Sequence, residues 1–288
     1  MSLQFPHTDL PSPGETLEIA PGIRWARLSL PFRLNHVNIY FIEDDGGWAI
    51  VDTGISNSES RAAWQALLDG PMAGQKFTRV IVTHHHPDHI GNAGWLCETL
   101  GVELLTSAGS FLSFLSLTNP SASAKADPYT HFYARHGMST EGAKLVSTLG
   151  HGYLRMVSMP PDSYHRLYQG MDLRIGSRQF KVLTGDGHSL EQVMLYDPSD
   201  NLFLAADQVI ERISPNISVF ASEPAADPLG PSRRELDREL RLLAGPVDPA
   251  DRPRCHAAAL RMADSLEELD VGGVAEVDER QRHRGRHP

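Results

Sequence analysis

The chain has 288 residues, of which 41% are apolar and 22% charged, and its formal net charge at pH 7 is -10. These values describe an ordinary globular protein that can bury a sizeable core, and they argue against a disordered chain. A pI near 5.7 disfavours a broad nucleic-acid-binding face, so we expect no nucleic-acid partner.

The sequence also bears on the cellular compartment. No apolar run has membrane-spanning length, and the N-terminus lacks a basic region followed by an apolar stretch, so we expect neither membrane association nor secretion. The two cysteines, Cys97 and Cys255, are too few for a disulfide framework and stand outside any CxxC pair. We therefore expect a cytoplasmic protein without a sulfur-rich metal site.

The first quarter of the chain has the pattern of β-strands. Three segments alternate or are β-rich: residues 23–32, 37–44 and 47–54. Gly46-Gly47 predicts a hairpin between the last two of them. Residues 56–71 then predict a helix, with serines at its start and Gly70-Pro71 at its end.

A short buried strand over residues 77–84 carries a cluster of histidines at its carboxyl end. A helix over 90–101 and a strand over 102–107 are predicted to follow. Open sheets place their sites at the carboxyl ends of strands, where loops converge. From about 108 to 169 the pattern becomes irregular and helical, which predicts a helical insertion rather than a second domain. Residues 171–219 return to hairpins, with a polar turn between two of the strands.

The composition changes after Gly230. Residues 231–288 contain no Phe, Tyr, Trp or Ile, and Arg recurs throughout. Residues 233–245 predict one helix, but no segment resembles a buried strand, and the last residues have the composition of a disordered tail. We therefore divide the chain into a folded domain, 1–230, and an atypical C-terminal segment, 231–288. One hypothesis for this segment is a frameshift in the gene or in its recorded sequence, which resequencing the locus would test.

The stretch Thr83–Asn92, "THHHPDHIGN", places four histidines and one aspartate within ten residues. His84 and His86 lie two positions apart, so on an extended segment their side chains project to the same side. The proline that follows turns the chain and can direct Asp88 and His89 to a neighbouring point. Because neutral imidazole and carboxylate together suit zinc or iron, the pattern predicts a metal site.

Within this stretch, "THHHPDH" resembles the HxHxDH signature of the metallo-β-lactamase superfamily. The likeness runs in order from about residue 22 to 229, with "IVDTG" before the signature and "TGDGHSLEQV" and "LFLAADQV" after it. The resemblance implies an α/β fold, an αββα sandwich of two mixed sheets, with the helical insertion at 108–169. It also implies a zinc-dependent hydrolase that uses a metal-bound hydroxide on a small ester, thioester, lactone or amide.

Carried onto this chain residue by residue, the resemblance implies a site for two Zn²⁺ ions. The ligands divide between the ions, with His84, His86 and His188 for the first, Asp88 and His89 for the second, and Asp207 bridging both. Asp88 is also the expected catalytic residue, which holds or shuttles the proton of the hydroxide. Asp52, in "VDTG", is expected to orient the ligands by accepting hydrogen bonds from them or from the loop.

Two histidine assignments differ from the family pattern. His85 stands between two ligands on an extended segment, so it should point away and have a surface or packing role. The family also supplies a further histidine for the second metal, after a strand and in a small-residue context. His256 stands at a comparable distance, but no apolar strand precedes it and no glycine follows it. The second zinc would then be weak, completed by water or absent.

Other functions stay open at this point. A mononuclear iron dioxygenase acting on glutathione persulfide uses two histidines and one aspartate in the same fold, which makes Fe²⁺ the alternative cofactor. A nuclease usually adds a basic surface that this acidic chain lacks. A decayed, non-catalytic family member without the second metal site is the non-enzyme alternative. We expect a small-molecule substrate, whose identity does not follow from the fold, and the oligomeric state stays open.

Overall fold

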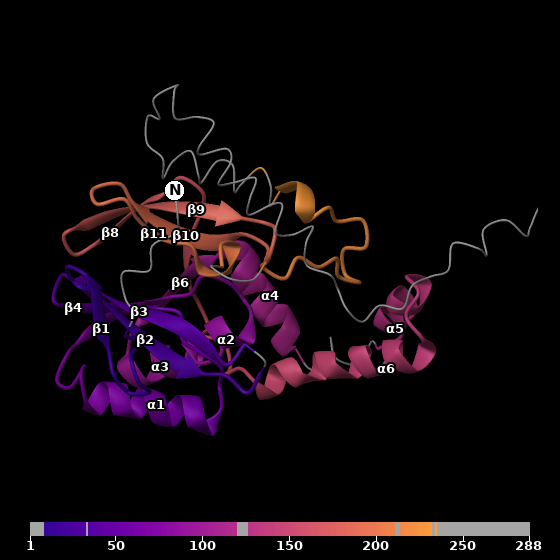
Figure 1. The fold of residues 1–288 in the computed structure, drawn as a ribbon, viewed down its shortest axis with the longest axis horizontal. Coiled ribbons are helices and arrows are strands. Elements are labelled where there is room, and N and C mark those ends of the chain that lie inside the picture. The colour runs from indigo at the N-terminus through magenta and orange to yellow at the C-terminus, as the bar shows by residue number, and fades with distance from the viewer. Residues whose placement is uncertain (1–8, 33, 120–125, 211–213, 232–233, 235–288) are drawn as a thin grey trace, which may run out of the picture. The chain divides into compact units, whose positions relative to one another are not determined.

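Two β-sheets pack face to face in the part of the chain that the computed structural model describes, which is residues 9–32, 34–119, 126–210, 214–231 and 234 (Figure 1). The first sheet has seven strands in sequence order: β1 (Leu17–Ala20), β2 (Ile23–Ser29), β3 (His36–Asp44), β4 (Gly47–Val51), β5 (Phe77–Ile81), β6 (Glu103–Ser107) and β7 (His165–Leu167). Neighbours from β1 to β4 are antiparallel, and neighbours from β4 to β7 are parallel. This is a mixed sheet, as the family resemblance implies.

The second sheet has four strands in the order β11-β10-β9-β8. Their bounds are β8 (Asp172–Ile175), β9 (Arg178–Gly185), β10 (Gln192–Asp197) and β11 (Leu202–Leu204). All of its pairs are antiparallel in the described part of the chain, whereas a mixed sheet was expected. Consecutive hairpins therefore build this sheet, as the turn-rich sequence after residue 171 predicts.

The helices lie beside the first sheet, in the predicted insertion, or, for η2, after the last strand of the second sheet. They are α1 (Ser58–Asp69), α2 (Pro87–Ile90), α3 (Ala93–Leu100), α4 (Ala108–Thr118), α5 (Ala126–Arg135) and α6 (Thr140–Leu149), with short 3-10 helices η1 (Gly150–Arg155) and η2 (Ala206–Gln208). α1 and α3 lie on the outer face of the first sheet (Figure 1). The helices α1 and α3, the first sheet and the second sheet thus form three layers of the expected sandwich.

The apolar side chains separate into two cores, one on each face of the first sheet. On the outer face, Trp64 of α1 packs edge to face against Phe41 of β3, with ring centroids 5.8 Å apart. Between the sheets, residues such as Val51 and Ile81 meet Phe180 and Val182 of β9. Because both faces of β4 and β5 are buried, these strands are fixed firmly and their carboxyl ends have defined positions.

Local signals explain the two helices that flank β5. The Asn57 side chain accepts a hydrogen bond from Ser60 N at 2.7 Å, so Asn57, and not one of the predicted serines, caps α1. α1 ends at Gly70, as predicted. α3 ends at Gly101, which has φ 67° and adopts the left-handed conformation that favours glycine.

The predicted insertion at 108–169 contains α4, α5, α6 and η1, and its last residues form β7, which pairs with β6 and extends the first sheet. The chain after η1 returns along α2 and α3. A Cβ atom on Gly91 would lie 2.8 Å from the Met156 carbonyl oxygen, and one on Gly94 would overlap that of Met159. These glycines let the insertion pack against the helices that follow the histidine cluster.

The described residues all belong to one compact unit, Leu3–Glu239. The helix expected at 233–245, apart from Arg234, and the rest of the atypical segment 235–288 lie outside the described residues. No helix among the residues that the structure describes is both long and apolar enough to cross a membrane.

Candidate metal centre

The parallel neighbours β4 and β5 place the first site residues side by side. Val51 at the end of β4 is in register with Ile81 at the end of β5, so Asp52 and Thr83 follow at the same edge of the sheet. Asp52 has φ 62°, a left-handed conformation that costs a non-glycine residue about 1–2 kcal/mol. Strain of this kind persists where the surrounding contacts fix the residue, and the carboxylate of Asp52 makes such contacts.

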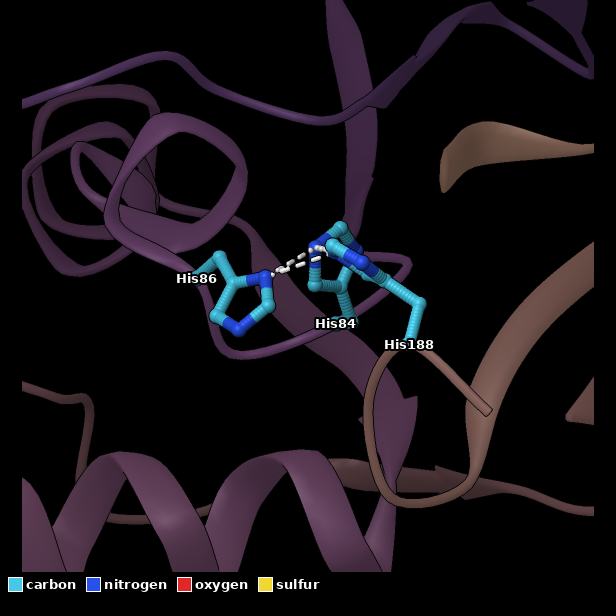
Figure 2. Close-up of side chains that lie close together, drawn as sticks. All are labelled: His84, His86 and His188. Carbon is cyan, nitrogen blue, oxygen red and sulfur yellow. Dashed lines mark hydrogen bonds between the residues drawn. The ribbon is translucent and has the colours of Figure 1, made fainter. Parts of the chain in front are cut away.

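Three histidine nitrogens converge on one point (Figure 2). His86 Nδ1 lies 3.0 Å from His84 Nε2 and 2.8 Å from His188 Nε2, and the two Nε2 atoms are 3.2 Å apart. Tetrahedral zinc with nitrogens at 2.0–2.1 Å separates two ligand nitrogens by about 3.3 Å. Converging lone pairs repel one another unless a cation or a proton lies between them, so this donor set fits a bound metal ion.

The other ring nitrogen of two of these histidines has its own partner. Thr83 Oγ1 lies 3.0 Å from His84 Nδ1, and the carbonyl oxygen of Asn216 lies 2.9 Å from His188 Nδ1. A carbonyl oxygen only accepts, so His188 carries its proton on Nδ1 and presents an unprotonated Nε2 to the point of convergence. When the Thr83 hydroxyl donates its hydrogen to Asp52, its oxygen can accept from His84 Nδ1. His84 then has the same tautomer as His188, with its proton on Nδ1.

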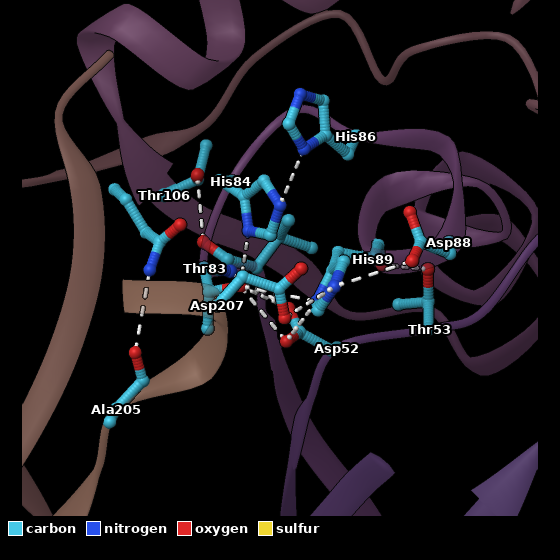
Figure 3. Close-up of polar contacts among 12 residues, drawn as sticks. Asp52, Thr53, Thr83, His84, His86, Asp88, His89, Thr106, Ala205 and Asp207 are labelled. Carbon is cyan, nitrogen blue, oxygen red and sulfur yellow. Dashed lines mark hydrogen bonds and ion pairs between the residues drawn. The ribbon is translucent and has the colours of Figure 1, made fainter. Parts of the chain in front are cut away.

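The Asp52 carboxylate is in contact with both Thr83 and His89 (Figure 3). Its Oδ1 accepts from Thr83 N at 2.8 Å, and Thr83 Oγ1 lies 3.0 Å from Oδ1 and 2.9 Å from Oδ2. Its Oδ2 also lies 2.8 Å from His89 Nδ1. One buried carboxylate therefore orients His89 directly and His84 through Thr83, which is the position predicted for Asp52.

Asp207 stands between His188 and His89. It lies in η2 directly after β11, and its Oδ2 is 3.4 Å from His188 Nε2 while its Oδ1 is 3.4 Å from His89 Nε2. One ligand atom from each of His84, His89 and Asp207 also lies within 4.8 Å of the others. The carboxylate can therefore face two neighbouring ions at once.

Asp88 contributes a second carboxylate beside His89. Its Oδ2 is 3.6 Å from His89 Nε2, and its side chain is 20% exposed, whereas that of His89 is 4% exposed. Asp207 is similarly accessible, at 22%. The two carboxylates therefore form the open side of the group, and His84, His89 and His188 form its buried side, whereas His86 is half-buried.

Burial keeps the three converging histidines neutral. It lowers the pKa values of His84 and His86 well below the ordinary value, and the neighbouring imidazoles lower them further. Burial also lowers the pKa of His188, although Asp207 opposes this shift. Only neutral imidazole binds a metal, so the environment favours the ligand form.

His89 lies in an electrostatic environment opposite to that of the three converging histidines. Burial alone would lower the pKa of His89, but the carboxylates of Asp207, Asp52 and Asp88 outweigh it and raise that pKa well above its ordinary value. Burial alone would raise the pKa of Asp207, but His89 and His188 hold it below its ordinary value. Three carboxylates around one buried imidazole create a negative potential that attracts a cation.

The structure thus brings together the residues that the sequence singles out: His84, His86, Asp88, His89, His188, Asp207 and Asp52. His85 is not among the converging histidines; its Nδ1 lies 2.9 Å from Ser189 Oγ, and its ring lies against that of His86, with centroids 4.9 Å apart. His256, the candidate for the last ligand, lies outside the described residues.

Several residues that serve this group were not predicted. Thr83 gives a recognisable signal, because a hydroxyl directly before the first histidine can reach the ring nitrogen that does not bind metal. Thr53 is similar: its N and Oγ1 both donate to the His89 carbonyl oxygen, at 2.8 and 2.7 Å. Asn216 gives no side-chain signal, because it acts through its backbone carbonyl.

The fold and this His/Asp group agree with the comparison to known families. Residues 33–250 match the family model of the metallo-beta-lactamase superfamily, so the chain belongs to that superfamily. Membership and the converging side chains together indicate a hydrolase-like fold with a histidine-rich site that could bind a metal ion.

Solved structures give the same result. A beta-lactamase domain protein from Burkholderia ambifaria is 38% identical, with a TM-score of 0.72 over 80% of this chain and 67% of its own. A metallo-beta-lactamase family protein from Thermus thermophilus is 26% identical, with a TM-score of 0.69 over 87% of this chain and 82% of its own. Comparison with curated proteins found no match.

Proposed function

We propose that this chain is a zinc-dependent hydrolase that holds two ions and acts on a small ester, thioester, lactone or amide. The observation that carries the proposal is the position of Asp207. Its two oxygens lie at equal distances, 3.4 Å, from His188 Nε2 and His89 Nε2, which belong to the two different ligand groups. A carboxylate between two groups of nitrogen ligands suits a pair of neighbouring ions.

The charges of the group support two divalent ions. In this proposal His84, His86 and His188 would hold the first ion, Asp88 and His89 would hold the second, and Asp207 would reach both. The imidazoles are neutral when they bind metal, whereas Asp52, Asp88 and Asp207 together carry three negative charges. Buried or half-buried carboxylates are costly unless cations compensate them, and two divalent ions supply that compensation.

The chemistry is divided between the ions and the protein. When bound, zinc acidifies a coordinated water and polarises a carbonyl oxygen. Asp88 then accepts and holds the proton that the water loses, because its carboxylate lies at the open side of the group. Asp52 and Thr83 hold His89 and His84 in the correct tautomers. The substrate approaches from the side of Asp88 and Asp207, where the site is accessible.

Metal content of the purified full chain, measured by inductively coupled plasma mass spectrometry, tests the proposal. We expect about two zinc ions per chain and fewer in Asp88→Asn. Asp45→Asn is the matched control, because Asp45 is 73% exposed and its ion pair with Arg174 is at the surface. One bound iron would instead support a persulfide dioxygenase, and no bound metal would support a non-catalytic family member.

Hydrolysis is tested with a panel of small esters, thioesters, lactones and amides. We expect turnover that a chelator abolishes and that zinc restores. Absence of turnover across the panel in a protein that holds two zinc ions would contradict the hydrolase proposal. Equal activity with and without the chelator would contradict its dependence on metal.

Replacing Thr83 by valine should weaken zinc binding by about 10- to 100-fold. Valine keeps the shape of threonine but removes the hydroxyl that links His84 Nδ1 to Asp52, so His84 no longer has a fixed tautomer. Thr83→Ser keeps the hydroxyl and should bind zinc nearly as tightly as the unchanged chain. Affinities come from titration against a chromogenic chelator, and equal affinities for the valine and serine variants would refute this role.

A further inference from the structure

His85 is the histidine of the cluster that the metal-site proposal leaves unused. It stands between His84 and His86 in the sequence, but it is not among the residues whose ligand atoms converge. Burial lowers the pKa of His85 to about 4, so its ring is neutral at physiological pH. A half-buried neutral imidazole beside a site can serve packing alone. It has a further role if its polar atoms bond to residues that position the site.

The side chain of His85 reaches the loop that carries His188. His85 Nδ1 is 2.9 Å from Ser189 Oγ, and Ser189 is the residue directly after His188. The two loops come from different sheets, because one follows β5 and the other connects β9 to β10. A backbone hydrogen bond also joins the two regions: Val193 N, in β10, donates to the carbonyl oxygen of Thr83 at 2.8 Å.

The backbone of His85 reaches the helical insertion. Tyr153, in η1, donates its hydroxyl hydrogen to the His85 carbonyl oxygen at 2.6 Å. The Tyr153 ring is buried in the outer core, with only 7% of the residue exposed. Its hydroxyl is therefore a fixed donor that restrains the chain between His84 and His86.

A covalent role for the serine does not fit these contacts. A nucleophilic serine needs an accessible hydroxyl and a base that a third group orients. Ser189 is only 5% exposed, and no carboxylate contacts the His85 ring among the residues that the structure describes. The pair therefore acts on the position of its neighbours and not on a substrate.

We propose that His85, Ser189 and Tyr153 form a clamp that holds the three ligands of the first ion in place. Ser189 fixes the His188 loop to the His84–His86 segment, and Tyr153 fixes that segment to the insertion. Ligands from two sheets must hold their positions within about 0.5 Å, and a bond between the adjacent residues supplies that restraint. The inference rests on the proposed metal site and adds three positioning residues to it.

Cobalt binding tests the clamp without using catalysis. The full chain is stripped of metal and titrated with Co²⁺, whose visible absorption reports affinity and coordination geometry. Ser189→Ala removes one hydroxyl and should weaken Co²⁺ binding by about 10- to 100-fold, and so should His85→Ala. His85→Asn places an amide near the former Nδ1 and should restore most of the affinity. Tyr153→Phe should weaken binding by a smaller factor and change the spectrum.

The double variant His85→Ala/Ser189→Ala distinguishes a clamp from two separate effects. Because both single changes remove the same bond, the double variant should bind Co²⁺ no more weakly than His85→Ala alone. His165→Ala is the control, since the side chain of His165 is 61% exposed and pairs with Glu103 away from the site.

Three results would overturn the clamp: unchanged cobalt affinity in folded Ser189→Ala and His85→Ala, additive losses in the double variant, or no rescue by His85→Asn. In each of these the unchanged chain still binds cobalt, so the proposed metal site survives. Failure of the unchanged chain to bind cobalt or zinc would overturn the proposed function, and the clamp with it.

Discussion

Asp207→Asn is expected to leave about one zinc ion or fewer per chain and to lower the rate of hydrolysis on the order of 10³-fold. Asparagine keeps the size of the side chain, but it loses the charge and one of the two oxygens. Those oxygens face His188 Nε2 and His89 Nε2, so the variant can no longer serve both ligand groups. Metal content and turnover, measured on the same preparation, check the result.

The variant should remain folded, because the Asp207 side chain is 22% exposed and the apolar cores are untouched. Asp172→Asn is a matched control on the second sheet, where the exposed side chain of Asp172 pairs with Lys181. Two bound zinc ions in Asp207→Asn would show that this carboxylate does not join the two groups, and the dinuclear proposal would lose its main support.

Much of the fold can be predicted because its signals are local. Paired glycines mark the β3–β4 hairpin, Gly70 and Gly101 end two helices, and alternating apolar residues mark strands of the first sheet. The sequence is less informative where tertiary packing decides. β7 has three residues and forms only because it pairs with β6, so the sequence pattern places its segment in the helical insertion.

The residues of the candidate site likewise divide into those with a local sequence signal and those that come from distant segments. His84, His86, Asp88 and His89 are predictable because four candidate ligands within six residues are a local pattern that packing does not produce. His188 lies in the loop between β9 and β10, and Asp207 lies in η2 after β11, so only the order of motifs along the chain connects them to the cluster. The structure adds the geometric reason, since His188 Nε2 lies within 3.2 Å of ring nitrogens of His84 and His86, and Asp207 lies 3.4 Å from both His188 and His89.

The partners of the ligands could not be predicted from the sequence. Ser189 and Tyr153 lie 104 and 68 residues from His85, and no spacing rule connects such positions. Asn216 acts through a backbone carbonyl, which any residue carries. Asp52 was predictable only because its motif, "VDTG", resembles that of the family; the structure adds that the parallel neighbours β4 and β5 end at the same edge.

Asp52→Asn is expected to give a folded protein whose rate of hydrolysis falls by 10²- to 10⁴-fold, an order-of-magnitude range. Asparagine tolerates the left-handed conformation at this position and can still accept from Thr83. Its NH₂ group then faces His89 Nδ1, which must become an acceptor, so the proton moves to Nε2. That nitrogen can no longer bind the second ion, and zinc content should fall towards one per chain.

Asp52→Ala separates this tautomer effect from loss of stability. Alanine leaves Thr83 and His89 without their shared acceptor in a buried position, and it keeps the left-handed strain, so unfolding should become easier by about 3–5 kcal/mol. Denaturant unfolding of the metal-free variants measures this difference. If Asp52→Asn were as unstable as Asp52→Ala, the carboxylate would act mainly on folding. If Asp52→Asn held two zinc ions and retained full activity, the tautomer of His89 would not depend on Asp52.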